Sequence, residues 1–198
     1  MGTDHASAKR SVIVDAAAQL FEANGYHATS MRTIAEAVGI AKPTLYHYFK
    51  SKDAILSDIH DQFIDLLLDG HRRRAASASG PRNELLALMT DMLELMETHH
   101  GHVRVFFEHH RELPSARRPA VIAKRNEYMH IVESTIRQGI DAGEFRELDV
   151  SLAALAVFGM CNWTYQWYRQ GGALQPRDIA TGFWDLVLDG FAPRVATA

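Results

Sequence analysis

Apolar residues recur with the period of an α-helix along most of this chain, and no stretch alternates convincingly as a strand would. Near the N-terminus, apolar side chains fall at i, i+3, i+4, i+7 and i+8 and predict an amphipathic helix over about residues 8–24. These side chains are Ile13, Ala16, Ala17, Leu20 and Phe21. Gly25 follows in the position where a left-handed residue commonly ends a helix.

Two short helices are predicted next. Thr29 or Ser30 can cap the first of them, which ends at Gly39. The second runs from about Lys42 to Tyr48. Pro43 fits its first turn, because the N–H that proline lacks has no helical partner there.

Two short helices joined by a tight glycine-containing turn and braced by a longer helix form a helix-turn-helix arrangement. The N-terminal part of the second short helix then enters the major groove of DNA. The side chains of that part are Lys42, Pro43, Thr44, Tyr46 and His47, whereas Leu45, Tyr48 or Phe49 would turn inward.

Ser51 can cap a fourth helix that begins at Lys52. A lysine in the first turn of a helix opposes the positive end of the helix dipole, and a DNA phosphate there would satisfy both. The alternative is that Lys50 and Lys52 are simply solvated, as charged side chains usually are.

The charge of the chain is distributed unevenly. Residues 1–52 carry a net charge of +2 and residues 53–198 a net charge of −5, within a total of −3. The chain as a whole is therefore not a basic protein that coats nucleic acid, but its N-terminal part is suited to meeting a polyanion.

The stretch from Lys9 to Leu56, which includes "IVDAAAQLFEANGYHATSMRTIAEAVGIAKPTLYHYFKSKDAIL", resembles the DNA-binding domain of the TetR family of bacterial repressors. The resemblance implies an all-helical homodimer of about nine helices that binds operator DNA and is released by a ligand. It further implies contacts to the DNA backbone from Thr29, Ser30 and Arg32, to bases and phosphates from Lys42, Thr44, Tyr46 and His47, and to a phosphate from Lys52. Ala41 departs from the family pattern, since a capping serine is common there, so the third helix would depend more on Pro43 and on packing.

The remainder of the chain is predicted to be helical as well. Helical patterns extend over about residues 53–77, 83–98, 103–112, 115–142, 150–168 and 176–191, with Gly80-Pro81 and Pro114 among the breaks. We therefore expect an all-α protein with a three-helix helix-turn-helix domain at residues 1–52. Residues 53–198 would form a helical ligand-binding and dimerisation domain.

The last two helices are more apolar than a monomer needs. The segment "VSLAALAVFGMCNWTYQWY" is apolar nearly all round, and its small residues Ala153, Ala156 and Gly159 suit a close helix approach. The final helix carries a similarly broad apolar surface. Together they predict a homodimer interface of four helices, two from each subunit. A monomer that folds these helices inward is the alternative.

A ligand pocket is predicted from aromatic and methionine side chains, because methionine adapts its shape to flexible apolar ligands. The predicted pocket residues are Met89, Met92, Phe106, Phe107, Tyr128, Asn162, Trp163, Gln166 and Trp167. Taken singly, each of them is also an ordinary core residue.

The stretch "GMCNWTYQWYRQGG" is similar to a branch of the TetR family that responds to acyl-CoA thioesters. This shorter resemblance implies an acyl-CoA effector, with CoA phosphates bound by Arg169 or by an arginine of residues 72–74. An apolar or amphipathic metabolite of another kind stays open as the effector.

Histidines and acids cluster in "THHGHVRVFFEHHRE", where His109 and Glu112 stand at i, i+3. Such spacing permits a metal site and hence a metal-responsive regulator, but adjacent histidines point in different directions and no cysteine joins them. Exposed histidines near a helix junction are therefore the favoured interpretation, and no metal or cofactor is expected.

Catalysis has little support in the sequence. The glycines form no phosphate-binding loop, no motif groups a nucleophile with a base, and the single cysteine, Cys161, lies in an apolar helix. An all-helical ligand carrier or a thioester-handling enzyme is the competing class. One cysteine, no signal peptide and no long apolar run favour a bacterial cytoplasmic protein that does not enter membranes.

Overall fold

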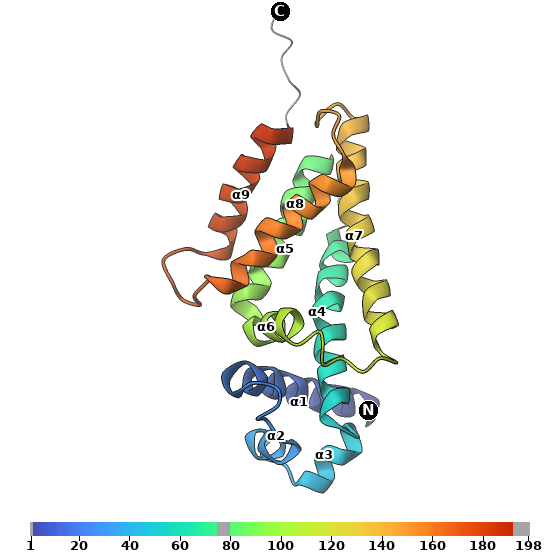
Figure 1. Ribbon diagram of the computed structural model, residues 1–198, viewed down its shortest axis with the longest axis vertical. Helices are drawn as coiled ribbons and strands as arrows, with labels where there is room; N and C mark the ends of the chain where they lie inside the picture. The colour runs from blue at the N-terminus through green and yellow to red at the C-terminus, as the bar shows by residue number, and fades with distance from the viewer. Residues whose placement is uncertain (1, 75–79, 192–198) are drawn as a thin grey trace, which may run out of the picture. The chain divides into compact units, whose positions relative to one another are not determined.

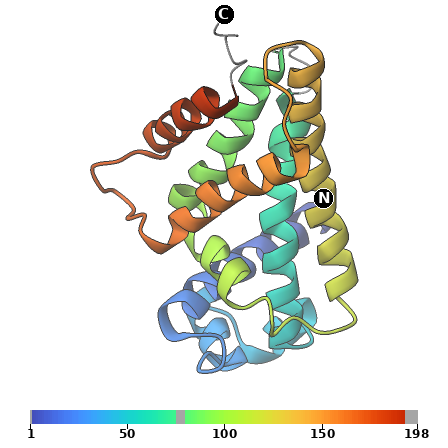
Figure 2. The ribbon, with the colours of Figure 1, turned by 45° about the horizontal axis from the view of Figure 1, so that its top comes forward.

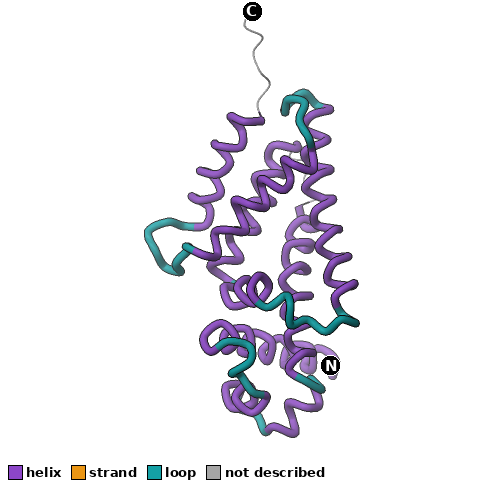
Figure 3. The backbone as a smooth tube through the Cα atoms, viewed as in Figure 1, coloured by secondary structure: helices purple, strands orange, loops and turns teal. Residues whose placement is uncertain are grey.

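The computed structural model describes residues 2–74 and 80–191, and all regular structure in these residues is helical (Figures 1 and 3). The expected all-α fold is thus confirmed. The nine α-helices and one 3₁₀ turn of the described residues are α1 (Gly2–Asn24), α2 (Met31–Val38), α3 (Lys42–Tyr48), α4 (Lys52–Arg74), α5 (Gly80–Thr98), α6 (His100–Glu108), α7 (Arg118–Asp141), α8 (Val150–Trp163), η1 (Thr164–Gln166) and α9 (Pro176–Phe191).

The described residues group into two compact units, one within Met1–Ile64 and His99–Ala123 and the other within Asp65–Thr98 and Lys124–Ala198. The first unit therefore holds the three N-terminal helices, the first part of α4, α6 and the start of α7. This division by packing differs from the functional boundary predicted between residues 52 and 53, which stays a prediction.

Local signals set the helix ends in the first unit. Gly25, after α1, has a φ of 82°, and Gly39, after α2, has a φ of 68°, both values that glycine adopts without steric cost. Of the two candidate caps, Ser30 caps α2, since its hydroxyl accepts a hydrogen bond from the Thr33 N–H at 3.1 Å. These turns allow α1, α2 and α3 to pack against one another as the helix-turn-helix arrangement requires.

The core of the first unit is formed by the apolar stripes of α1 to α4. Its fully buried side chains include Ile13, Phe21, Ile34, Leu45, Phe49, Ile55 and Ile59. The start of α6 lies directly on α1: a Cβ atom added to Gly101 would stand 3.0 Å from the backbone carbon of Ala18. A larger residue at this position would need the two helices to move apart by a few tenths of an ångström.

The second unit is organised around α5, against which α8 and α9 pack (Figures 1 and 2). The buried face of α5 is Leu85, Leu88, Met89, Met92, Leu93, Leu95 and Met96. A glycine also allows a close contact at the end of α7, where the ring of Phe145, in the turn after this helix, lies directly on Gly139.

Several helix ends differ from the predicted ones. The helix expected over residues 103–112 begins at His100 and ends at Glu108, because the backbone leaves the helix at His109 and forms a turn before Pro114. The helix expected to end near residue 168 ends at Trp163 and tightens into η1. The predicted end of the fourth helix near Ser77 lies outside the described residues.

Candidate nucleic-acid interface and neighbouring sites

Helix α3 presents a polar outer face and an apolar inner one. Lys42, Thr44, Tyr46 and His47 are exposed. Leu45 and Phe49 are buried, and Tyr48 is half-buried. The Lys42 ammonium lies 5.9 Å from the centre of the Tyr46 ring, so cation and aromatic face share one surface. The four predicted α3 contacts are thus brought together on one exposed helix.

The start of α3 has no side-chain cap. Ala41 occupies the N-cap position and makes no capping hydrogen bond, and Pro43 stands in the first turn. Leu45, which is fully buried, donates its backbone N–H to the Ala41 carbonyl at 3.1 Å. Proline and packing therefore start this helix in place of a serine cap.

The three residues predicted to contact DNA from α2 are not equally placed. Ser30 and Arg32 lie at the surface, and Arg32 pairs with Glu36 one turn later at 2.7 Å. Thr29 is only 2 % exposed, and its hydroxyl donates to the carbonyls of Gly25 and Leu20. The Thr29 hydroxyl thus serves the turn before α2, and a contact of Thr29 to the DNA backbone stays a prediction. The sequence did not reveal the burial, because threonine is common both at the surface and in buried turns.

Lys52 is half-buried, and its ammonium faces protein atoms. It donates to the carbonyls of Tyr26 at 2.6 Å, Thr29 at 2.9 Å and His27 at 3.4 Å. These contacts explain how a lysine is tolerated at the positive end of the α4 dipole, since carbonyl oxygens compensate its charge. The predicted phosphate contact of Lys52 is therefore in competition with internal partners.

The predicted ligand residues are divided between the two units. Met89, Met92 and Tyr128 are buried in the second unit, where the Tyr128 hydroxyl donates to the Leu88 carbonyl at 3.4 Å. Phe106 and Phe107 belong to the first unit and pack on Phe63. Because each group already has close neighbours, these residues lie in two packed interiors.

The aromatic residues at the end of α8 point outward. Trp163 is 64 % exposed, Trp167 and Gln166 are exposed, and Asn162 is half-buried. A pocket role for Trp163 stays a prediction, because the single chain leaves this side chain mostly exposed. Since α8 is apolar nearly all round, its sequence does not tell which face turns toward α5.

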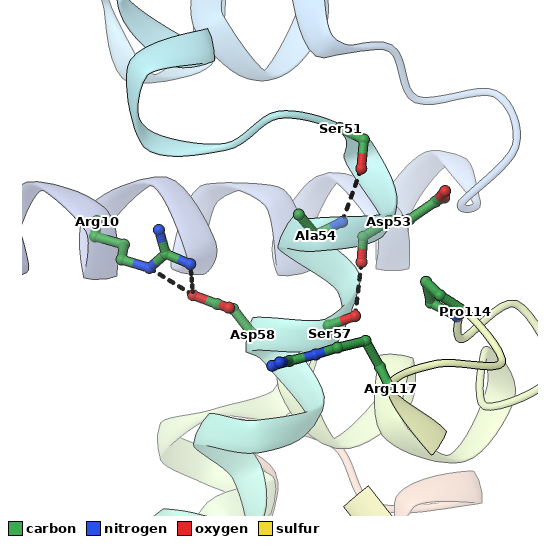
Figure 4. Close-up of a pocket in the computed structure, with 8 residues that line it drawn as sticks. All are labelled: Arg10, Ser51, Asp53, Ala54, Ser57, Asp58, Pro114 and Arg117. Atoms are coloured by element: carbon green, nitrogen blue, oxygen red, sulfur yellow. Dashed lines mark hydrogen bonds and ion pairs between the residues drawn. The ribbon is translucent and has the colours of Figure 1, made fainter. Parts of the chain in front are cut away.

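A pocket that the sequence did not reveal lies in the first unit, beside the start of α4 (Figure 4). It encloses about 370 Å³. Its lining residues are Arg10, Ser51, Asp53, Ala54, Ser57, Asp58, Pro114 and Arg117. Arg10 holds Asp58 at 2.7 Å and the Tyr48 carbonyl at 2.8 Å, so α1, α3 and α4 meet at this arginine. Proximity in sequence could not predict the pocket, because its residues come from three distant segments.

His100 and His102, at the start of α6, each face a different acidic residue of α1. His100 Nδ1 lies 2.5 Å from Glu22 Oε1, and His102 Nε2 lies 3.5 Å from Asp15 Oδ1. His102 also approaches the Gln62 side-chain oxygen at 3.3 Å and is buried, contrary to the expectation of exposed histidines. Within the described part of the chain, no three or more possible ligands gather as a metal site would need.

Burial, and secondly the charge of His99, lowers the pKa of His102 to about 4. The ordinary value is 6.5, so between these values the unfolded chain binds a proton that the folded chain does not. Folding stability is thus expected to fall as pH decreases from about 6.5 to 4, by at most roughly 3 kcal/mol from this group. Urea unfolding at a series of pH values checks this prediction. His102→Gln should lose most of the slope in that window, whereas the same change at the exposed His130 should keep it.

Cys161 has the character of a core residue. It is fully buried, and burial raises the pKa of its thiol to about 12. The thiolate required of a nucleophile is therefore scarce at neutral pH. None of the described helices is both long and apolar enough to cross a membrane.

A short exposed helix, held by a second helix and a glycine turn, defines this chain as a helix-turn-helix DNA-binding protein. Comparison with known families supports this class, with one match in the N-terminal part of the chain and one in the C-terminal part. Residues 13–59 match the family described as "Bacterial regulatory proteins, tetR family", and residues 78–191 match "Tetracyclin repressor-like, C-terminal domain". The chain belongs to the TetR family of transcriptional repressors.

Individual relatives extend over nearly the whole chain. It is 32 % identical over 192 residues to the HTH-type transcriptional repressor KstR2 of Rhodococcus jostii, covering 96 % of this chain and 94 % of that one. The structure of the ketosteroid transcriptional regulator KstR2 of Mycobacterium tuberculosis superimposes with a TM-score of 0.83 at 28 % identity, covering 93 % of this chain and 95 % of that chain. The structure of AibR in complex with isovaleryl coenzyme A and operator DNA superimposes with a TM-score of 0.79 at 28 % identity, covering 90 % of this chain and 97 % of that chain.

Proposed function

We propose that this protein is a homodimeric repressor that binds a palindromic operator and is released from it by an acyl-CoA thioester. It would act in the bacterial cytoplasm and catalyse no reaction. The observation that carries the DNA-binding part is the exposed, polar face of α3 above the buried core of the helix-turn-helix. Each dimer would present two such helices roughly 34–36 Å apart, one turn of DNA.

The dimer is supported by an apolar face of α8 that its own subunit leaves uncovered. Along this face the residues at i, i+3, i+4, i+7 and i+11 are exposed. They are Leu152, Leu155, Ala156, Gly159 and Trp163. On α9, Leu186 is 70 % exposed. Large apolar side chains exposed in a row mark an interface, and α8 pairing with its symmetry mate buries them.

The acyl-CoA effector is supported by relatives and by one feature of the chain. AibR binds isovaleryl coenzyme A, and a fatty acid metabolism regulator of Bacillus subtilis is 29 % identical over 157 residues. Of the arginines predicted to meet CoA phosphates, Arg169 is exposed, whereas Arg74 is half-buried between Asp91 and Glu84. Arg73 is exposed as well, and Arg72 is exposed but pairs with Asp69 and Glu127, so Arg169 and Arg73 are the better placed candidates.

Titration of acyl-CoA thioesters into the protein–operator complex tests the proposal. The operator is first found by gel shift with the DNA upstream of the protein's own gene. A cognate thioester is expected to weaken operator binding by roughly 5–150-fold, the range of a coupling free energy of about 1–3 kcal/mol. By reciprocity, operator DNA weakens thioester binding by the same factor.

The matching free acids and CoA alone serve as controls, and Arg169→Ala should reduce the response to thioesters without changing affinity for the operator. Release by a free acid but by no thioester would remove CoA from the proposal. Turnover of a thioester by a protein that binds no DNA fragment would favour the enzyme class.

A further inference from the structure

We propose that Arg10 of α1 is a positioning residue for the recognition helix α3, because it holds the C-terminal end of α3 against the first turns of α4. This inference rests on the DNA-binding function proposed above. It concerns the placement of the side chains that α3 presents to DNA and leaves every predicted DNA contact as it stands. The residues that carry it all belong to the first unit.

Helix α3 has little of its own to fix its position. It spans only seven residues, Lys42–Tyr48, and its N-cap residue Ala41 makes no side-chain hydrogen bond. Helices of this length are not stable by themselves in water. The position of α3 therefore depends on its packing and on contacts at its C-terminal end.

Arg10 supplies such a contact to the last residue of α3. Its Nη1 donates a hydrogen bond to the Tyr48 carbonyl at 2.8 Å. The last carbonyls of a helix lack partners within the helix and lie at the negative end of its dipole, so a guanidinium is doubly favourable there. The guanidinium also lies over the ring of Phe49, the next residue, with 4.0 Å between Cζ and the ring centre. The arginine thus holds the chain at the point where α3 ends.

The same guanidinium is bound to α4. Nε and Nη2 of Arg10 each lie 2.7 Å from Asp58 Oδ2, at the wall of the pocket (Figure 4). Burial raises the pKa of Asp58, and the nearby charges of Arg10 and Arg117 counteract this rise. A guanidinium has five donors in a fixed plane, so it can bind Asp58 and the Tyr48 carbonyl at once. Arg10 therefore fixes the end of α3 relative to both α1 and α4.

The C-terminal end of α3 carries two of the side chains predicted to meet the operator. Tyr46 and His47 are exposed and directly precede Tyr48. Displacement of this end would move both side chains relative to the base edges, whose hydrogen bonds require precise geometry. Attraction to phosphates depends mainly on charge and would change less. Arg10 is therefore expected to act on sequence-specific binding more than on non-specific binding.

The first test replaces Arg10 by methionine, which keeps an unbranched stem and removes the guanidinium. Arg10→Met is expected to weaken operator binding by roughly 5–150-fold, the effect of losing about one base contact. Binding to a scrambled duplex, and its dependence on salt, should stay close to wild type. Arg104→Met is the matched control, because Arg104 is exposed to a similar extent, 38 % against 42 %, and pairs with Glu108 within α6. It should leave both affinities unchanged.

Arg10→Lys separates positioning from a general contribution of the charge. A lysine ammonium can still pair with Asp58, but it lacks the planar fork that binds two partners and stacks on Phe49. The free energy of unfolding in urea should therefore recover most of the loss seen for Arg10→Met. The ratio of specific to non-specific DNA affinity should stay low.

Amide hydrogen exchange in the free protein measures the anchor directly. The Phe49 N–H closes the last turn of α3 on the Leu45 carbonyl at 2.9 Å. It should exchange faster in Arg10→Met and Arg10→Lys, while the amides of α5 stay unchanged. Asp58→Asn keeps the shape of its side chain and removes the charge, so it should give the same local change to a smaller extent. It also decides the question if Arg10→Met fails to fold.

A lower free energy of unfolding with an unchanged affinity ratio would overturn the proposal, because Arg10 would then contribute to stability alone. Full recovery of the affinity ratio in Arg10→Lys would overturn it as well. So would a salt slope reduced by about 0.9 in Arg10→Met with unchanged exchange at Phe49, which would indicate a lost phosphate contact. If the wild-type protein binds no operator, the proposed function fails. The exchange measurement still decides on the anchor, since it needs no DNA.

Discussion

Leu155→Glu is expected to dissociate the dimer and to weaken operator binding by roughly 10²–10⁴-fold. Leu155 lies in the middle of the exposed α8 face and is itself 56 % exposed. In a symmetric interface the substitution places two carboxylates, one from each subunit, against apolar surface and near one another. Burial of the charges and their mutual repulsion are both unfavourable. A monomer then binds only one half-site. It loses the high effective concentration at which, in a dimer, the second recognition helix meets the second half-site.

Sedimentation or light scattering measures the first effect and operator titration the second. Ile122→Glu is the matched control, because Ile122 is 50 % exposed on α7, outside the α8 face. It should stay dimeric and bind the operator as the wild type does. A Leu155→Glu protein that remains dimeric at micromolar concentration would show that the subunits associate elsewhere.

The sequence predicted best those elements whose signals are local. Helix α3 occupies Lys42–Tyr48 and α9 begins at Pro176, as expected. In both helices a proline stands in the first turn and marks the helix start directly. The choice between Thr29 and Ser30 as the cap of α2 needed the structure. The hydroxyl of either residue can accept a capping hydrogen bond from a backbone N–H of α2, and only the fold shows that Thr29 faces inward.

Contacts between distant segments were beyond the sequence. His102 was expected to be exposed, but the close approach of Gly101 to α1 carries the next residue into the interior beside Asp15. Lys52 was expected to face DNA, because the pattern around it shows a helix start but not the carbonyls of the turn at Tyr26. Neither partner is close in the chain, so no local periodicity could reveal it.

The direction of an apolar helix was equally undetermined. In α8 the apolar residues surround the axis, so the sequence predicted a pocket or core position for Trp163 without determining which way its side chain turns. The structure places it on the surface, in line with Leu152 and Leu155. Correct identification of the helix therefore did not determine the role of its residues.

The second large effect is expected at the recognition helix, where Tyr46→Ala and His47→Ala should each weaken specific operator binding by about 1–3 kcal/mol, roughly 5- to 150-fold. This is the range for loss of a side chain that contacts a base edge. Both side chains lie on the exposed face of α3, and the buried residues that hold this helix, Leu45 and Phe49, remain in place. The substitutions should therefore leave the fold and the dimer intact, which circular dichroism and sedimentation can verify.

Specificity distinguishes this effect from a loss of charge or of stability. Since neither residue is a lysine or an arginine, binding to non-specific DNA and its dependence on salt should stay close to wild type. His130→Ala is the control for His47→Ala, because His130 is a highly exposed histidine on α7. Fluorescence anisotropy with operator and scrambled duplexes at several salt concentrations provides the measurement. Equal weakening on both duplexes would show that α3 meets only the DNA backbone. The operator sequence would then have to be recognised by another part of the helix-turn-helix domain or through the shape of the DNA.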